Sequence, residues 1–132
     1  MDTFTLQATS GWHQSSTQII GTVYVRISAE GAWNANPASG PNYGPDGTDR
    51  FSTAGRPSYA YHGSDGREGE LVAKVGANGP VFPVRSAFQG QLSSAEPAWL
   101  YFVINDDITD AAGSGLEDNI GSVNINIYTE PV

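Results

Sequence analysis

A run of acidic residues near the C-terminus carries the strongest chemical signal in the sequence. It begins with Asn105-Asp106-Asp107, ends with Glu117-Asp118-Asn119, and contains five carboxylates and no basic residue. Carboxylates crowded on one loop repel one another unless a cation lies among them, and calcium takes roughly six to eight oxygen ligands. The run therefore indicates a calcium-binding loop. A solvated acidic loop in an acidic protein is the alternative that composition leaves open.

The spacing within this run does not match an EF-hand. Asp106, Asp110 and Glu117 fall at positions one, five and twelve of such a loop, but position three is Ile108. Position six, where the turn needs glycine, is Ala111, and the flanking segments have strand patterns. If calcium binds here, a second segment of the chain has to complete its ligands.

Catalytic chemistry has weaker support. His13 and His62 are the only two histidines, and no serine lies in a strand-elbow-helix motif that would mark a nucleophile. We therefore expect a protein that is not an enzyme, with a two-carboxylate glycosidase as an alternative because acidic residues are abundant. Four aromatic residues in or beside loops could stack on a sugar, although packing in the core or in turns is their commoner role: Trp33, Tyr43, Tyr59 and Tyr61.

The elements that would position these residues are predicted to be strands. Apolar and polar residues alternate over residues 23–27 and 123–127, which is typical of half-buried strands. Further strand candidates are residues 3–8, 16–20, 70–75, 81–84 and 98–105. About seven short strands separated by turn-rich loops favour an all-β antiparallel sandwich that forms a single domain over residues 1–132. Residues 50–69 lack a strand pattern, which favours a functional or mobile surface loop.

Charge and composition narrow the partners. Lys and Arg number 6 against 14 Asp and Glu, a formal net charge of −8 that disfavours nucleic acid and anionic membranes. The absence of cysteine excludes disulfides and thiolate metal sites. The N-terminus has no signal-peptide pattern, and no run approaches the roughly 20 apolar residues of a membrane span. We expect a soluble protein that is cytoplasmic, or extracellular after export without a classical signal peptide.

The order of several motifs resembles the calcium-dependent galactose-binding bacterial lectins of the LecA type. In that family an apolar strand ends in Asn-Asp, as at Asn105-Asp106, and a pair such as Asp118-Asn119, with glycine two residues later, opens the last strand. Upstream matches follow in the same order, from residues 17–20 through Trp33, Tyr43-Gly44-Pro45-Asp46-Gly47 and residues 70–76. The resemblance covers the chain from about Thr17 to its end.

The resemblance implies a jelly-roll-like β-sandwich in which a calcium ion bridges the protein and the terminal galactose of a glycan. It implies that Asp106, Asp118 and Asn119 supply side-chain ligands and that Asn36 supplies a main-chain carbonyl. The chain between Asp106 and Asp118 is longer than in the family. The remaining carbonyl could therefore come from either of two residues, Thr109 or Gly115, of which Gly115 is preferred because it stands three residues before Asp118.

The sugar contacts are less fixed by the resemblance. Asp106 and Asp118 would touch the sugar as well as the ion, but residues 48–69 form a longer loop without a clear copy of the family's His and Gln. Asp49, Arg50 or His62 could take that role. Relatives form tetramers, which implies a homo-oligomer. The rival from another class is a calcium-stabilised structural or adhesive β-sandwich that binds no sugar.

Overall fold

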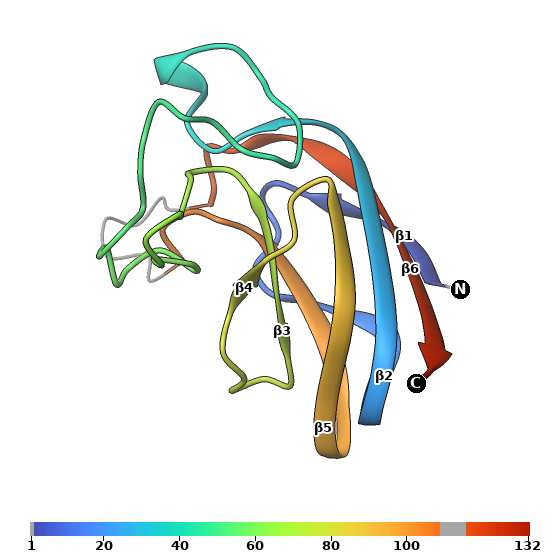
Figure 1. The fold of residues 1–132 in the computed structure, drawn as a ribbon. Coiled ribbons are helices and arrows are strands. Elements are labelled where there is room, and N and C mark those ends of the chain that lie inside the picture. Colours follow the sequence, from blue (N-terminus) through green and yellow to red (C-terminus); the bar gives the residue numbers. More distant parts are fainter. Residues whose placement is uncertain (1, 109–115) are drawn as a thin grey trace.

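The fold of the protein is all-β, as the sequence predicts. A computed structural model describes residues 2–108 and 116–132, and within them every strand pairing is antiparallel, in the order β1-β6-β2-β5-β3-β4 (Figure 1). The strands are β1 Asp2–Gln7, β2 His13–Asn34, β3 Leu71–Val75, β4 Phe82–Pro83, β5 Ala87–Ile104 and β6 Ile120–Pro131, and a short 3-10 helix, η1, spans Pro37–Ser39. The predicted antiparallel all-β architecture is confirmed.

Two long strands turn this one sheet into two layers. Residues 13–19 of β2 pair with the last part of β5, whereas residues 21–28 pair with its first part, and the register shifts between Ile19 and Gly21. Gly21 has a φ of +62°, a left-handed conformation that glycine adopts without a steric cost. The β2-β5 ribbon folds over at this point, so that β6 and β3 lie in different layers (Figure 1).

The folded ribbon corrects two details of the sequence prediction. Residues 16–20 and 23–27, expected as separate strands, belong to the single strand β2. Residues 87–97, for which no strand was expected, form the first part of β5. That part has two large apolar residues, Phe88 and Leu92, and no β-branched residue, so its strand conformation follows from pairing with β2 more than from local sequence preference.

The hydrophobic core lies between the two layers. The inward residues of β1, β2 and β6 meet those of β3 and β5, and the rings of Phe4 and Phe102 approach to 5.6 Å between centroids. The fully buried core side chains include Leu6, Ile19, Val25, Ile27, Leu71, Leu100, Phe102, Ile125 and Ile127. No helix within the described ranges has the length and hydropathy needed to cross a membrane.

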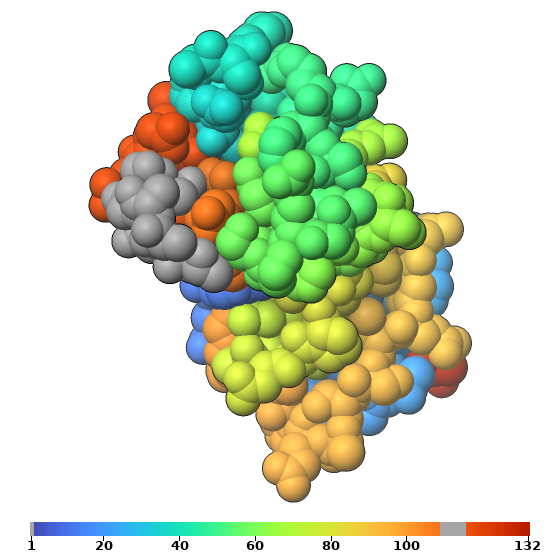
Figure 2. Space-filling model, turned by 90° about the vertical axis from the view of Figure 1, so that its left-hand side faces the viewer, coloured from blue at the N-terminus to red at the C-terminus, as the bar shows by residue number. Residues whose placement is uncertain are grey.

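The long connections gather at one end of the sandwich. The loop after β2 and the segment 50–69 lie next to the end of β5 and the start of β6 (Figures 1 and 2). An isolated bridge between Tyr59 and Asp107 ties the segment to the chain just after β5, and a bridge between Ser52 and Arg67 closes the segment on itself. The loop that lacked a strand pattern is therefore attached to the end of the sheet that carries the acidic residues.

Candidate functional site

Asn105 fixes the segment 50–69 against the end of β5. Its side chain is fully buried, and its Oδ1 accepts a hydrogen bond from the Tyr61 N–H at 2.8 Å. Its Nδ2 donates to Thr53 Oγ1 at 3.1 Å and to the Arg67 carbonyl at 2.9 Å. All the hydrogen-bonding groups of this side chain are thus used in joining distant pieces of chain. Asn105 is a structural residue, and its hydrogen bonds hold the segment 50–69 against the chain next to Asp106.

Asp106 is a buried carboxylate with one oxygen unpartnered. The residue is 5% exposed, its Oδ1 accepts from the Asp107 N–H at 2.8 Å, and its Oδ2 has no hydrogen-bond partner. Burial raises the pKa of Asp106 to about 7, with the Asp107 N–H and the neighbouring Asn119 amide opposing the rise and the charges of Glu68 and Asp118 adding to it. A buried oxygen without a donor is unfavourable unless something else binds it.

Asn119 presents a second unpartnered oxygen beside Asp106. The residue is 4% exposed, its Nδ2 donates to the Ala8 carbonyl at 2.9 Å, and its Oδ1 has no partner. The bond to Ala8, just beyond the end of β1, fixes the amide so that its oxygen remains as the free group. One carboxylate oxygen and one amide oxygen are therefore left without donors at the junction of β5 and β6, and these are the ligand types that calcium prefers.

Glu68 belongs to the same neighbourhood, and the sequence analysis did not predict it. It is 7% exposed, and Tyr59 Oη donates to its Oε2 at 3.2 Å. Burial raises the pKa of Glu68, with the Tyr59 hydrogen bond and the charge of Arg50 opposing the rise and that of Asp118 adding to it. In the sequence, Glu68 is marked only by its place before Gly69, two residues ahead of β3. The fold, not the spacing, brings Glu68 within electrostatic range of Asp106 and Asp118.

Two aromatic residues pack against the backbone next to Glu68. Trp33 is fully buried and its Nε1 donates to the Gly69 carbonyl at 2.8 Å. Tyr43 Oη accepts from the Ala35 N–H at 2.9 Å, and its ring lies so close to Gly69 that an added Cβ would be 2.1 Å from the hydroxyl. Burial raises the pKa of Tyr43 to about 12, with the Glu68 and Asp106 charges contributing. Trp33 and Tyr43 therefore serve mainly in packing.

The residues expected to touch a sugar lie on the exposed part of the segment and the loop before it. Arg50 is exposed, its Nη2 donates to the Pro41 carbonyl at 3.4 Å, and its guanidinium lies 5.7 Å from the centre of the Tyr43 ring. His62 is exposed and its Nδ1 lies 3.3 Å from the Tyr59 carbonyl. Asp49 is also exposed. Arg50 is electrostatically coupled to Glu68.

The structure supports the remaining expected ligands of the ion to different degrees. Asp118 is exposed but close enough for its charge to raise the pKa of Asp106. Asn36 follows the end of β2, where Asn34 pairs with Ile120, and its carbonyl accepts from the Ser39 N–H and Oγ, both at 2.9 Å. A cation at that carbonyl would compete with the Ser39 hydroxyl. Thr109 and Gly115, the candidates for a further carbonyl, lie outside the described residues.

The donor chemistry fits a hard cation, although carboxylates alone do not enclose one. In residues 2–108 and 116–132, no three Asp, Glu or His side chains are grouped so that they could hold a metal ion. Coordination would therefore have to include amide and main-chain oxygens, as the free Oδ1 of Asn119 suggests. Calcium accepts such mixed oxygen sets, whereas softer metals favour nitrogen and sulfur ligands.

Comparison with known proteins identifies the fold. No family model and no curated protein matches the chain. Among solved structures it is similar to one described as the EclA N-terminal domain, a PllA-like lectin, with a TM-score of 0.69 and 15% sequence identity over 98% of this chain and 97% of that chain. The protein therefore has a lectin-like fold, shared over nearly its whole described length.

Proposed function

We propose that this protein is a calcium-dependent lectin that recognises terminal galactose-type sugars. One observation carries the proposal: the buried, unpartnered oxygens Asp106 Oδ2 and Asn119 Oδ1 lie at the junction of the loops, in a lectin-like fold. Buried polar atoms without partners are rare in proteins, and two neighbouring oxygens of this kind are suited to bind a cation. The sequence resemblance to LecA-type lectins supports the same site.

Residues from three parts of the chain would hold the ion. Asp106 follows β5, and Asp118 and Asn119 precede β6. Main-chain carbonyls, from Asn36 and from Gly115 beyond the described residues, would complete the set. When bound, calcium supplies open coordination positions that the neutral hydroxyl oxygens of a sugar can fill.

The chain's own residues would orient the sugar. Asp106 and Asp118 could each accept a hydrogen bond from a sugar hydroxyl while their charge is balanced by the ion. His62, Asp49 and Arg50 lie on the exposed surface nearby and are the candidates for contacts outside the coordination shell. Because a single monosaccharide site of this kind binds weakly, assembly into an oligomer, a tetramer by resemblance, would raise the avidity for glycans that carry several galactose residues.

A thermal titration tests this function. The melting temperature is measured with chelator, with calcium, and with calcium plus galactose, mannose or glucose. A ligand that binds only the native state raises stability by mass action, by about 2.7 kcal/mol at a concentration 100-fold above its Kd. We expect one rise with calcium and a second with galactose that needs calcium.

The rival functions give different results in the same experiment. A calcium-stabilised structural or adhesive domain would show the first rise and no response to any sugar. A glycosidase would release product from a chromogenic glycoside. No rise with calcium at a free concentration of several millimolar would contradict the metal site itself.

A further inference from the structure

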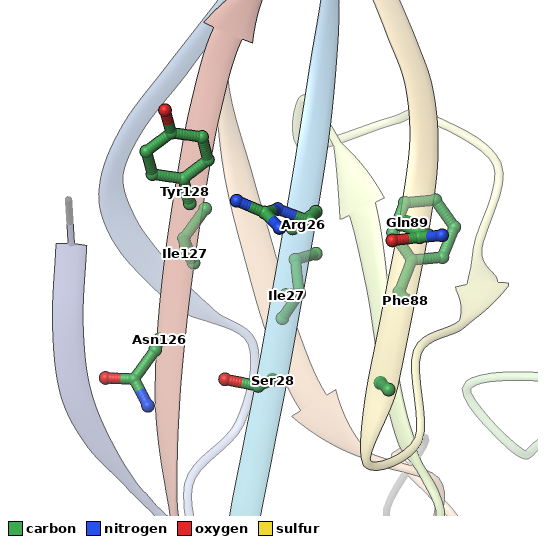
Figure 3. Close-up of a pocket in the computed structure, with 9 residues that line it drawn as sticks. Arg26, Ile27, Ser28, Phe88, Gln89, Asn126, Ile127 and Tyr128 are labelled. Atoms are coloured by element: carbon green, nitrogen blue, oxygen red, sulfur yellow. The ribbon is translucent and has the colours of Figure 1, made fainter.

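The outer face of the sheet carries a second feature, away from the loop end. A depression of about 590 Å³ lies across β6, β2 and β5, and Figure 3 shows the side chains of Arg26, Gln89 and Tyr128 on the face turned away from the other layer. Strand register explains its shape. Arg26 pairs with Tyr128 and Gln89 to form one outward row, and Ser28 pairs with Asn126 and Ala87 to form the next.

The floor of this groove is main chain. The row between the two outward rows is centred on Ile27, whose side chain points into the core and is 2% exposed. Alternation of side chains along a strand leaves the outward rows about 7 Å apart, so the backbone between them is open. One wall of the groove consists of the long side chains of Tyr128, Arg26 and Gln89. The opposite wall is lower, because Ser28 and Ala87 have short side chains. Its volume of about 590 Å³ falls in the range of small-molecule sites.

Hydrogen-bond donors dominate the walls. The Arg26 guanidinium lies 4.9 Å from the centre of the Tyr128 ring, and within the described part of the chain the ion pairs are those of Arg85 alone. Arg26 is therefore held in place by an aromatic ring and not by a carboxylate. Asn126 Oδ1 already accepts from Thr3 Oγ1 at 2.9 Å, which leaves its Nδ2 as a donor.

The charge of the groove is opposite to that of the protein. None of its lining residues is acidic, although Asp and Glu outnumber Lys and Arg by 14 to 6 in the chain. The nearest outward carboxylates along the strands, Glu30 and Glu130, belong to the rows beyond the groove, and Glu130 Oε2 accepts a hydrogen bond from Tyr128 Oη at 3.5 Å. A guanidinium free of ion pairs, beside amide and hydroxyl donors, matches a carboxylate, which it can bind through two parallel hydrogen bonds.

We propose that this groove binds a carboxylate-bearing saccharide, such as a hexuronic acid, independently of the calcium site. Arg26 binds the carboxylate, and Asn126, Ser28 and Gln89 bind ring hydroxyls. The choice of a saccharide rests on the proposed lectin function. The choice of an anion rests on the donors and charges of the groove itself.

Backbone amide chemical shifts of the ¹⁵N-labelled protein provide the test. D-galacturonate is titrated into the chain in the presence of chelator, with D-galactose as the uncharged control. We expect saturable shifts at Arg26, Asn126 and Tyr128 for galacturonate, at least tenfold weaker binding for galactose, and weakening by added salt. Removal of the guanidinium in Arg26→Gln should lower galacturonate affinity at least tenfold.

Two further variants make the result specific. Arg56→Gln removes an exposed arginine that stacks on Phe51 at the loop end, and should leave galacturonate affinity unchanged. Glu130→Gln removes the carboxylate beyond the Arg26 row and should raise the affinity a few-fold. Equal shifts with galactose, no shifts at these amides, or the same affinity for Arg26→Gln as for the wild type would overturn the proposal.

The same variants distinguish the saccharide site from an interface between two copies of the chain, and from a failure of the lectin proposal. If the groove is covered by a second copy of the chain, sedimentation would show a change of mass in Arg26→Gln and galacturonate would not bind, which overturns the saccharide site. The calcium arm is independent, because every measurement at the groove is made in chelator. Loss of the calcium-dependent galactose response would contradict the lectin proposal while leaving anion binding at Arg26 measurable.

Discussion

The loop end and the outer face of this protein carry unpaired polar groups of opposite kinds. At the loop end, Asp106, Asn119 and Glu68 present oxygens, two of which have no donor. On the outer face, Arg26 and Asn126 present N–H groups that lack a carboxylate partner. The first region fits a cation and the second fits an anion.

The two regions also differ in how deeply their polar side chains are buried. Asp106 and Asn119 are 5% and 4% exposed, whereas Tyr128 at the groove is 38% exposed. An unpaired group costs far more when it is buried than when water reaches it. Ligand binding at the loop end should therefore change the stability of the whole domain, while binding at the groove should be weaker and more sensitive to salt. The predictions below test this difference, from the largest expected effect to the smallest.

The substitution Asp106→Ala should have the largest effect. We expect it to remove the calcium-dependent rise in melting temperature, on the order of 10 °C at a calcium concentration 100-fold above the Kd, and all galactose-dependent stabilisation with it. The melting temperature in chelator should change little or rise, because the variant no longer buries an unpartnered carboxylate. Glu96→Gln, at an exposed position on β5, is the control. An unchanged sugar titration would remove Asp106 from the site.

The response to calcium should depend on pH. The pKa of Asp106 is raised from 3.8 to about 7, so between these values the metal-free folded state binds more protons than the unfolded state. The free energy of unfolding in chelator should therefore fall as pH rises from about 4 to 7. Calcium needs the ionised carboxylate, so its stabilising effect should grow over the same interval. Melting curves at pH 5, 6, 7 and 8, with and without calcium, measure both trends, and a calcium effect that is constant or declines with pH would contradict this role.

The substitution Glu68→Gln should have a smaller effect. It keeps an acceptor for Tyr59 but removes a charge near Asp106, so calcium affinity should fall only a few-fold and less so at high salt. Calorimetric titration with calcium at two salt concentrations measures this. A complete loss of calcium binding would instead make Glu68 a direct ligand of the ion.

The smallest effect is expected for His62→Ala. One hydrogen bond to a sugar contributes about 0.5–1.5 kcal/mol, so galactose affinity should weaken about two- to tenfold while calcium affinity stays the same. Exposed Arg56 lies in the same segment, and Arg56→Gln provides the control. Equal galactose affinity in wild type and His62→Ala would place the histidine outside the sugar contact.

Much of the architecture was predictable because local patterns specify strands. The alternation at residues 23–27 and 123–127 located parts of β2 and β6, and the apolar run before Asn105 located the end of β5. The sequence also marked Asp106 and Asn119, because they stand in the acidic run between two predicted strands. It could not predict residues 87–97 as part of β5, because that segment has no β-branched residue and only two large apolar ones, and it takes its conformation from pairing with β2.

The amino-acid sequence by itself determined the strand periods, the net charge, and which acidic and amide residues end up beside β5 and β6. These properties depend on neighbours in the chain. Only the tertiary structure decided that Glu68 lies near Asp106 and that Asn105 joins distant segments instead of binding a ligand. It also decided that Arg26 and Asn126 stand in neighbouring outward rows of a groove that no acidic residue lines. The physical reason is that desolvation and pairing depend on distances through space, and strands β2 and β5 fold residues far apart in the chain onto one another.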